Sequence, residues 1–295
     1  MSELRPLTFG EVLGGALTMY RRHFRLFLPL SVVLLAVPVG LGGSFGHPLF
    51  VPRIAMDNMM MFMMDPVGAA KVLGPITVLY FLAFLFLTAA TARVISDAHL
   101  SRAPSFSAAL GLGGKRMWPL FLVGLAKFVL LGGLLGVIVG TYGVVGFMMN
   151  RAGIGLLADI VTAAIAAVGL WVLAVVASGY AVTTQVVALE RLPGAFQAFG
   201  RSWRLTKGFR FKVFALIAAA ILLFFVIPTV ILFIIGGMWS PATQFASIAM
   251  LVVTLLVPLV LSPAIACVFT LMYYDLRVRR EGFNLQALSQ AVGIT

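Results

Sequence analysis

Lys127 is the one basic residue that lies well inside a long apolar segment, residues 118–149. A charge at the centre of a membrane span costs roughly 2.5 to 3.5 kcal/mol on insertion scales, so it is expected to face protein or water and to have a partner. If the next apolar segment returns antiparallel, Tyr180, Thr184 and Gln185 lie at a comparable depth. Two interpretations stay open. The ammonium reaches back to the cytoplasmic interface, or it lines a polar cavity that receives a lipid phosphate or another anion.

Glycines repeat at four-residue spacing in the same segment, at Gly132, Gly136 and Gly140. Small residues on one stripe of a membrane helix allow another helix to approach closely. This pattern predicts tight helix packing, either within the bundle or between protomers. A flexible gate is the alternative use of these glycines.

Other residues with metal or catalytic chemistry form weaker patterns. Six of the 14 methionines lie in the segment 56–64, and thioethers are soft ligands suited to Cu(I). No Cys or His pair accompanies them, and methionine equally suits an adaptable apolar contact. Proton-coupled carriers usually use a carboxylate within the membrane, and here Asp159 lies only near the outer end of the fourth segment, with no carboxylate deeper in a span. We therefore predict neither an enzyme nor a bound metal or cofactor.

The composition indicates the elements that position these residues. The chain is 62% hydrophobic with a net charge of +12, and its mean hydropathy is +1.10. A membrane span needs about 20 mostly apolar residues. Six segments are long enough, and they cover residues 26–43, 72–91, 118–149, 154–189, 211–237 and 245–273. The fourth segment is too long for one crossing, so it is expected to hold a span and a cytoplasmic extension.

The distribution of the basic residues predicts the orientation. Seventeen of the 21 Lys and Arg residues fall in four stretches: before the first span, between the second and third, between the fourth and fifth, and after the sixth. By the positive-inside rule, both termini lie in the cytoplasm, with six crossings of the membrane between them. The first apolar run is expected to be a retained span and not a cleaved signal. The polyanion that these basic residues are expected to contact is then the anionic leaflet, not nucleic acid.

A related unit occurs three times, at residues 8–27, 104–121 and 192–214. Each is a predicted short amphipathic helix that leads into a hairpin of two spans. The predicted fold is thus all-α, with three hairpins in a single membrane domain, residues 1–295, and approximate repeats at 1–100, 101–190 and 191–295. Thr8 and Glu11 have the spacing of a capping box, in which each side chain satisfies a free amide at the helix start.

The short helices are expected to place apolar side chains and basic side chains on opposite faces. Such a helix suits the headgroup level of a membrane, where each basic residue near an anionic leaflet contributes on the order of 1 kcal/mol. The predicted apolar faces are Phe9, Leu13, Leu17 and Tyr20 in the first unit, and Phe196, Phe199 and Trp203 in the third. The predicted headgroup contacts are Arg21, Arg22, Arg201, Arg204 and Lys207. Anchoring alone and recognition of lipid headgroups both remain open.

Charged residues directly after the last span have helical spacing. Asp275 can pair with Arg279, and Arg277 with Glu281, on a helix that continues into the cytoplasm. Gly282 is expected to end this helix. We interpret the run as a structural clamp and not as a catalytic site.

Three stretches of the chain resemble a known family. They are RPLTFGEVLGGALTMYRRHFRLF at 5–27, ALERLPGAFQAFGRSWRLTKGFRFKVF at 188–214 and YYDLRVRREGFNL at 273–285. They resemble the bacterial membrane-domain family associated with glycerophosphodiester phosphodiesterases. The resemblance implies a six-helix integral membrane protein, which in some relatives is joined to a soluble phosphodiesterase domain with a His, Glu and Asp set. Here His23, His47 and His99 lack an acidic cluster, so we expect the architecture without that activity.

The sequence thus predicts a non-enzymatic membrane protein with a structural or accessory role, which organises lipid or a partner protein at the cytoplasmic leaflet. The expected partners are membrane lipids with anionic headgroups, and either a second copy of the chain or another membrane protein. The alternative is a transporter or lipid-translocating protein with a path near the third and fourth spans, beside Lys127.

Overall fold

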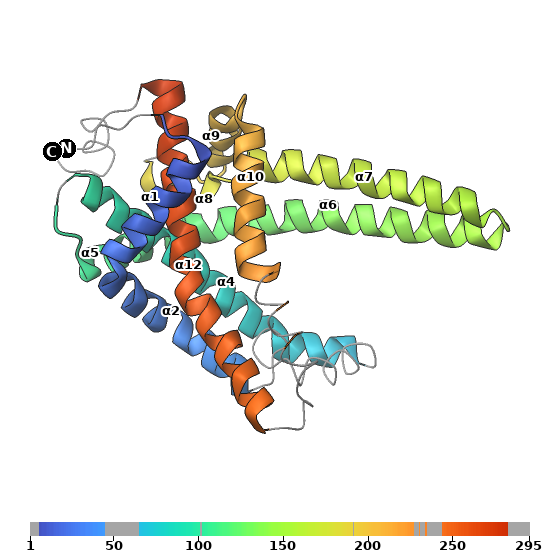
Figure 1. The fold of residues 1–295 in the computed structure, drawn as a ribbon, viewed down its shortest axis with the longest axis horizontal. Helices are drawn as coiled ribbons and strands as arrows, with labels where there is room; N and C mark the ends of the chain where they lie inside the picture. The colour runs from blue at the N-terminus through green and yellow to red at the C-terminus, as the bar shows by residue number, and fades with distance from the viewer. Residues whose placement is uncertain are drawn as a thin grey trace.

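The computed structural model describes residues 6–44, 65–100, 102–190, 192–226, 230, 234 and 244–282, and every regular element in these ranges is a helix (Figure 1). The Met-rich segment 56–64 lies outside the described residues. The helices are α1 (Phe9–Arg22), α2 (Phe24–Ser44), α4 (Pro66–His99), α5 (Phe106–Lys115), α6 (Met117–Arg151), α7 (Gly155–Gly179), α8 (Thr183–Leu189), α9 (Gln197–Thr206), α10 (Arg210–Ile221), a π-helical turn (Leu222–Val226) and α12 (Gln244–Glu281).

Four helical stretches in the described part of the chain are long and apolar enough to cross a membrane. They are Thr77–His99, Met117–Arg151, Gly155–Leu189 and Leu259–Glu281. This confirms the all-helical membrane class. The first predicted span corresponds to α2, which contains a shorter apolar helix, Phe24–Val33. The fifth begins with α10 and continues beyond the residues that are fully described.

A short helix is followed directly by another helix at each of the three predicted units. His23 separates α1 from α2, Arg116 separates α5 from α6, and residues 207–209 separate α9 from α10. The capping box at the start of α1 is confirmed. The Thr8 amide donates to Glu11 Oε2 at 2.7 Å, and the Glu11 amide donates to Thr8 Oγ1 at 3.3 Å.

The face of α1 that packs on the protein lies beside the predicted apolar face and shares Tyr20 with it. Val12, Ala16 and Tyr20 are buried, at i, i+4 and i+8, and α1 packs on α12. Phe9 and Leu17 are instead exposed, Leu17 at 55%. The helix therefore has two apolar faces, one of which the protein covers.

The core lies where α1, α2, α4 and α12 meet. α4 and α12 cross and contact each other, and α2 and α1 pack against them (Figure 1). The largest side chains buried here include Phe27, Leu30, Leu87, Ile95 and Tyr273. This body of packed helices holds the polar groups described below in fixed positions.

Helices α6 and α7 lie side by side and project away from this body (Figure 1). They are connected by residues 152–154, where Gly153 has φ +75°. Large apolar side chains are exposed along the pair, for example Val137, Phe147, Leu156 and Trp171. An exposed surface of this kind is stable in hydrocarbon, where no water must be excluded from it.

The fourth apolar segment is not one continuous helix. α7 ends at Gly179, residues 180–182 form a turn, and α8 begins at Thr183. This break agrees with the prediction that residues 154–189 hold a span and an extension. All seven residues of α8 are buried.

Candidate functional site

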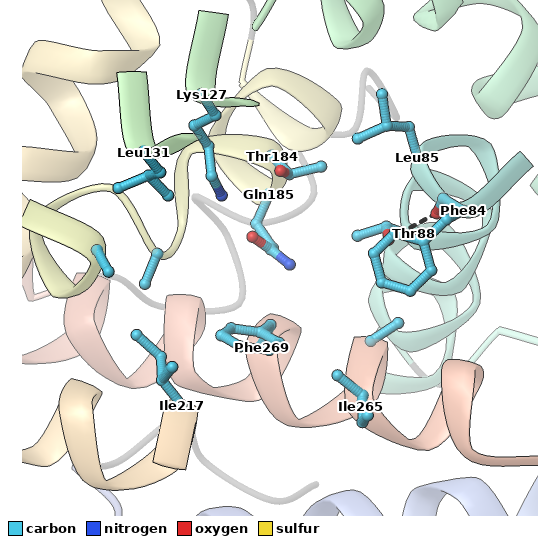
Figure 2. Close-up of a pocket in the computed structure, with 13 residues that line it drawn as sticks. Phe84, Leu85, Thr88, Lys127, Leu131, Thr184, Gln185, Ile217, Ile265 and Phe269 are labelled. Carbon is cyan, nitrogen blue, oxygen red and sulfur yellow. Dashed lines mark hydrogen bonds between the residues drawn. The ribbon is translucent and has the colours of Figure 1, made fainter. Parts of the chain in front are cut away.

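A cavity of about 270 Å³ lies where α4, α6, α8, α10 and α12 meet (Figure 2). Its polar lining consists of Lys127 from α6, Thr184 and Gln185 from α8, and Thr88 from α4. The remaining lining residues are apolar: Phe84, Leu85, Leu131, Ala177, Ala181, Ile217, Ile265, Ala266 and Phe269. Three of the four residues that the sequence predicted for a polar intramembrane site are therefore brought together, and Thr88 joins them.

The break between α7 and α8 positions two of these side chains. Because α8 starts a new helix after the turn, its first residues face the body of the protein and not the lipid-exposed side of α7. Figure 2 shows the Lys127 ammonium pointing toward Gln185, whose amide lies in the cavity. Gln185 is 2% exposed, and its Oε1 atom has no hydrogen-bond partner among the described residues.

The charge of Lys127 is not neutralised by an ion pair within the described part of the chain. Every residue that lines the cavity is neutral apart from this lysine. Thr88 donates its hydroxyl proton to the Phe84 carbonyl at 2.9 Å, so only its lone pairs remain for a ligand. The site therefore offers a bound molecule the Lys127 cation, the Thr184 hydroxyl and the Gln185 amide.

Two apolar cavities adjoin this polar chamber. One, of about 460 Å³, runs along α6 and α7 and shares Lys127 and Thr184 with the chamber; Phe128, Gly132 and Leu135 are among its other lining residues. The second, of about 320 Å³, lies between α4, α10 and α12 and shares Phe84, Ile217, Ile265 and Phe269 with the chamber. The polar chamber thus has an apolar arm on each of two sides.

Tyr180 does not line any of these cavities. It lies in the turn after α7, where its ring centroid is 5.2 Å from those of Phe199 and Trp203 in α9. The Ser202 hydroxyl donates to the Gly179 carbonyl at 2.8 Å in the same contact. The predicted place of Tyr180 in the polar site is wrong, because the turn that brings Thr184 inward directs Tyr180 toward α9.

The position of Lys127 along α6 explains how a cation can lie there. α6 has 35 residues, which is about 52 Å at 1.5 Å per residue, well beyond the about 30 Å of a hydrocarbon core. Leu120 and Val123, before Lys127, are buried in the protein, whereas Phe128, after it, is 66% exposed. Lys127 therefore lies where α6 leaves the body of the protein, near the end of α7, and not at the middle of an exposed span.

The glycines predicted for helix packing do not contact other helices. A Cβ atom at Gly132, Gly136 or Gly140 would have no neighbour within 4 Å in the described part of the chain. Close approach occurs instead at Gly124, where a Cβ would lie 2.6 Å from Leu85, and at Gly169, where it would lie 2.6 Å from Ile138. Close packing of the first three glycines is therefore not found among the described residues, and a contact between protomers stays a prediction.

Four of the five predicted headgroup contacts are exposed. Arg21 and Arg22 lie at the end of α1, and Arg204 and Lys207 at the end of α9. Arg201 instead bridges two carboxylates, with its Nε atom 3.0 Å from Glu190 Oε2 and its Nη1 atom against Glu281. Although burial lowers the pKa of Arg201, hydrogen bonds to Glu281 and Glu190 outweigh it and hold the pKa above its ordinary value. This guanidinium joins helices and is not free for a headgroup.

The Arg201 bridge belongs to a network that the sequence did not predict. Buried Tyr273 donates its hydroxyl proton to Glu190 Oε1 at 2.8 Å, and Arg277 Nη1 donates to the Tyr273 hydroxyl at 3.1 Å. The predicted pair of Arg277 with Glu281 is confirmed at 3.0 Å. The network fixes the end of α8 against α9 and α12.

A second network surrounds Asp275, which is 1% exposed. The Lys212 ammonium lies 2.6 Å from its Oδ2 atom, and the Leu7 amide donates to its Oδ1 atom at 2.6 Å. The predicted pair with Arg279 is confirmed at 3.0 Å. The structural clamp predicted for the end of α12 is therefore present, and it holds α10 and the chain before α1 as well.

The described residues contain no group of three or more His, Cys, Asp and Glu side chains that could hold a metal ion. Comparison of the chain with protein-family models, curated proteins and solved structures gave no match. The fold and the site together define an all-helical protein of the membrane class, with a cationic chamber between apolar cavities. The resemblance to the phosphodiesterase-associated membrane family stays a prediction.

Proposed function

We propose that this chain is a non-enzymatic protein of the bacterial inner membrane that organises lipid at the cytoplasmic leaflet. In this proposal the chain crosses the membrane six times as three hairpins, with both termini in the cytoplasm. The three short helices lie at the headgroup level. A second copy of the chain or another membrane protein covers part of the projecting α6 and α7 pair.

One observation carries the proposal. An exposed aromatic side chain lies at the start of the helix that follows each of the three short helices: Phe24 in α2, Trp118 in α6 and Phe211 in α10. Of these three, the amphipathic Trp118 is of the type that concentrates at membrane interfaces, and the basic residues beside the junctions, Arg25, Arg116 and Arg210, favour the cytoplasmic side. An aromatic residue next to a basic residue at all three junctions supports placement of the three at one leaflet.

The exposed residues of α1 support the same placement. Phe9 and Leu17 lie outside the core on α1, and Arg21 and Arg22 follow in its last turn. A surface that combines apolar and basic side chains suits an anionic leaflet, which each basic residue would stabilise by on the order of 1 kcal/mol.

The lipid around the protein tests this function. Polymer extraction of native membranes retains a ring of lipid around each protein, whose anionic fraction can be compared with that of the bulk membrane. We expect enrichment of anionic lipid around the wild type, and a smaller enrichment around the variant Arg21→Gln/Arg22→Gln. Lys71→Gln/Arg151→Gln is the matched control, because these two exposed cations lie between the first and second and between the third and fourth predicted spans, which the positive-inside rule places on the other side. A wild-type ring with the bulk composition would contradict the proposal.

The cavity beside Lys127 favours a second candidate, a protein that translocates lipid near α6 and α7. Purified protein in liposomes with a fluorescent lipid would show accelerated exchange between leaflets if this candidate were right. The lipid-organising proposal expects the exchange rate of protein-free liposomes. The polar lining is confined to four residues in one chamber. A polar lining this short supports retention of lipid more than its passage across the bilayer.

A further inference from the structure

We infer that the chamber at Lys127 binds the phosphate of one anionic phospholipid, whose acyl chains occupy the two adjoining apolar cavities. This inference rests on the proposed function and deepens it, because it names a specific lipid site apart from the ring of lipid around the protein.

The charge of the chamber indicates the headgroup of the bound molecule. Lys127 supplies one positive charge, and the residues that line the chamber and its two arms include no acidic side chain. A lysine ammonium donates three hydrogen bonds and binds phosphate oxygens as a point charge. A phosphodiester carries one negative charge, so one such group neutralises the site.

The polar neighbours define what surrounds the phosphate. Gln185 lines the chamber and is almost completely buried, and its Oε1 atom has no hydrogen-bond partner among the described residues. A buried polar atom without a partner costs about 1 to 3 kcal/mol, so a donor from the guest stabilises the site. The hydroxyls of a glycerol headgroup supply such donors. The Thr184 hydroxyl lies beside it and can donate to the phosphate (Figure 2).

The apolar cavities define the tail of the guest. Phe128 and Leu135 are among the residues that line the arm along α6 and α7, and Ile221 is among those that line the arm between α4, α10 and α12. All three side chains are exposed on the apolar surface of the protein. Both arms therefore open laterally to the hydrocarbon, so a lipid can enter from the bilayer without crossing water.

The depth of Lys127 also suits a headgroup. Lys127 lies where α6 leaves the protein body, close to the end of α7, and a stretch of about 20 residues beyond it is enough to cross the hydrocarbon. A phosphate at this level stays near the proposed cytoplasmic interface. Free inorganic phosphate is also anionic, but it has no apolar part that could fill the two apolar cavities. We therefore assign the site to a phospholipid.

Native mass spectrometry of the detergent-solubilised full chain tests the site. The protein is titrated with phosphatidylglycerol or with phosphatidylcholine of the same acyl chains. We expect one phosphatidylglycerol per chain, bound at least tenfold more tightly than phosphatidylcholine. Equal affinities for the two lipids would overturn the inference. So would displacement of phosphatidylglycerol by millimolar inorganic phosphate, since that result would show a site for a free anion.

Charge variants identify the residue responsible. We expect Lys127→Leu to lower the phosphatidylglycerol affinity at least tenfold, and Lys127→Arg to retain it within about threefold, because a guanidinium also binds phosphate. Lys115→Leu, at an exposed position at the end of α5, is the matched control and should leave the affinity unchanged. Wild-type affinity in Lys127→Leu would overturn the inference.

A steric variant tests the tail without altering charge. Gly132 lines the arm along α6, and a Cβ atom there meets no neighbour within 4 Å among the described residues, so the larger side chain of Gly132→Phe can extend into the arm and the variant is expected to fold. It should lower the affinity for both lipids at least fivefold, whereas Gly136→Phe, equally open but outside the lining, should not. Unchanged binding in Gly132→Phe would overturn the tail assignment. Loss of this single lipid with a retained anionic ring would leave the proposed function standing.

Discussion

The ammonium of Lys212 lies 2.6 Å from a carboxylate oxygen of buried Asp275, which connects α10 to α12. The same ammonium donates to the Leu7 carbonyl, and the Leu7 amide donates to the other oxygen of Asp275. Three parts of the chain that lie far apart in sequence are thus fixed by one carboxylate. The arrangement positions the first short helix, α1, against the end of α12.

Neutralising Asp275 should destabilise the protein strongly. Asp275→Asn keeps the shape of the side chain but leaves the Lys212 and Arg279 cations without their carboxylate. Removal of one partner from a buried ion pair costs about 3 to 5 kcal/mol. Thermal unfolding in detergent measures the change. Asp159→Asn, at an exposed position, is the matched control and should unfold like the wild type.

The double variant Asp275→Asn/Lys212→Met gives a further check on the same pair. It should recover part of the lost stability, because it also removes the ammonium left without its carboxylate. Equal stability of Asp275→Asn and the wild type would show that the clamp does not hold these segments.

Two buried tyrosines should respond in opposite ways to removal of their hydroxyl groups. The Tyr273 hydroxyl donates to Glu190 at 2.8 Å and accepts from Arg277, so Tyr273→Phe should lower the free energy of unfolding by about 1 to 3 kcal/mol. The Tyr20 hydroxyl is buried without a partner in the described part of the chain, and burial raises its pKa to about 12. Tyr20→Phe removes an unsatisfied polar atom and should be neutral or stabilising. Chemical denaturation of both variants tests the contrast, and a larger loss in Tyr20→Phe would contradict it.

Glycine substitutions should separate glycines that allow close packing from those on an open surface. A Cβ at Gly179 would overlap the ring of Trp203, so Gly179→Ala should force α9 away from α7 and destabilise the protein by about 1 to 3 kcal/mol.

Gly140→Ala meets open space and should raise helix stability by about 0.5 to 1 kcal/mol. If Gly140→Ala leaves the melting temperature intact but lowers the oligomeric mass in native mass spectrometry, the predicted contact between protomers gains direct support. Equal destabilisation by both changes would contradict the assignment of Gly179.

Several local features could be predicted from sequence because they depend on near neighbours. The capping box of Thr8 with Glu11 and the pair of Asp275 with Arg279 join residues three or four positions apart. Spacing on a single helix determines both. The length of residues 154–189 indicated a span with an extension, but it did not indicate the turn between α7 and α8, since α6 is unbroken over 35 residues.

Features that depend on distant neighbours were predicted less well. On α1 both Leu17 and Val12 belong to apolar stripes, and only the position of α12 determines that Val12 is the buried one. Spacing likewise showed Gly132 and Gly136 as a packing stripe, but the neighbouring helix approaches α6 at Gly124. The contact of Lys212 with Asp275 joins positions that no local pattern connects.

The candidate site was predicted in part. Lys127 was identified because a lysine within an apolar segment is costly, and Thr184 and Gln185 because they come back to a similar depth. Thr88 was missed, although a threonine at the polar edge of an apolar helix was the signal that could have indicated it. Tyr180 was assigned wrongly because a turn of three residues redirects the chain between it and Thr184.

The central claim is that the three short basic helices lie together at the cytoplasmic leaflet, and labelling of single cysteines tests it most directly. Cys267 is the one native cysteine and is buried, so Cys267→Ala gives a silent background. Arg22→Cys, Arg204→Cys and Arg151→Cys are then each treated with a membrane-impermeant maleimide in intact cells and in inverted vesicles. The account predicts that Arg22→Cys and Arg204→Cys react only in inverted vesicles, and Arg151→Cys only in intact cells. Reaction of Arg204→Cys and Arg151→Cys from the same side would contradict it.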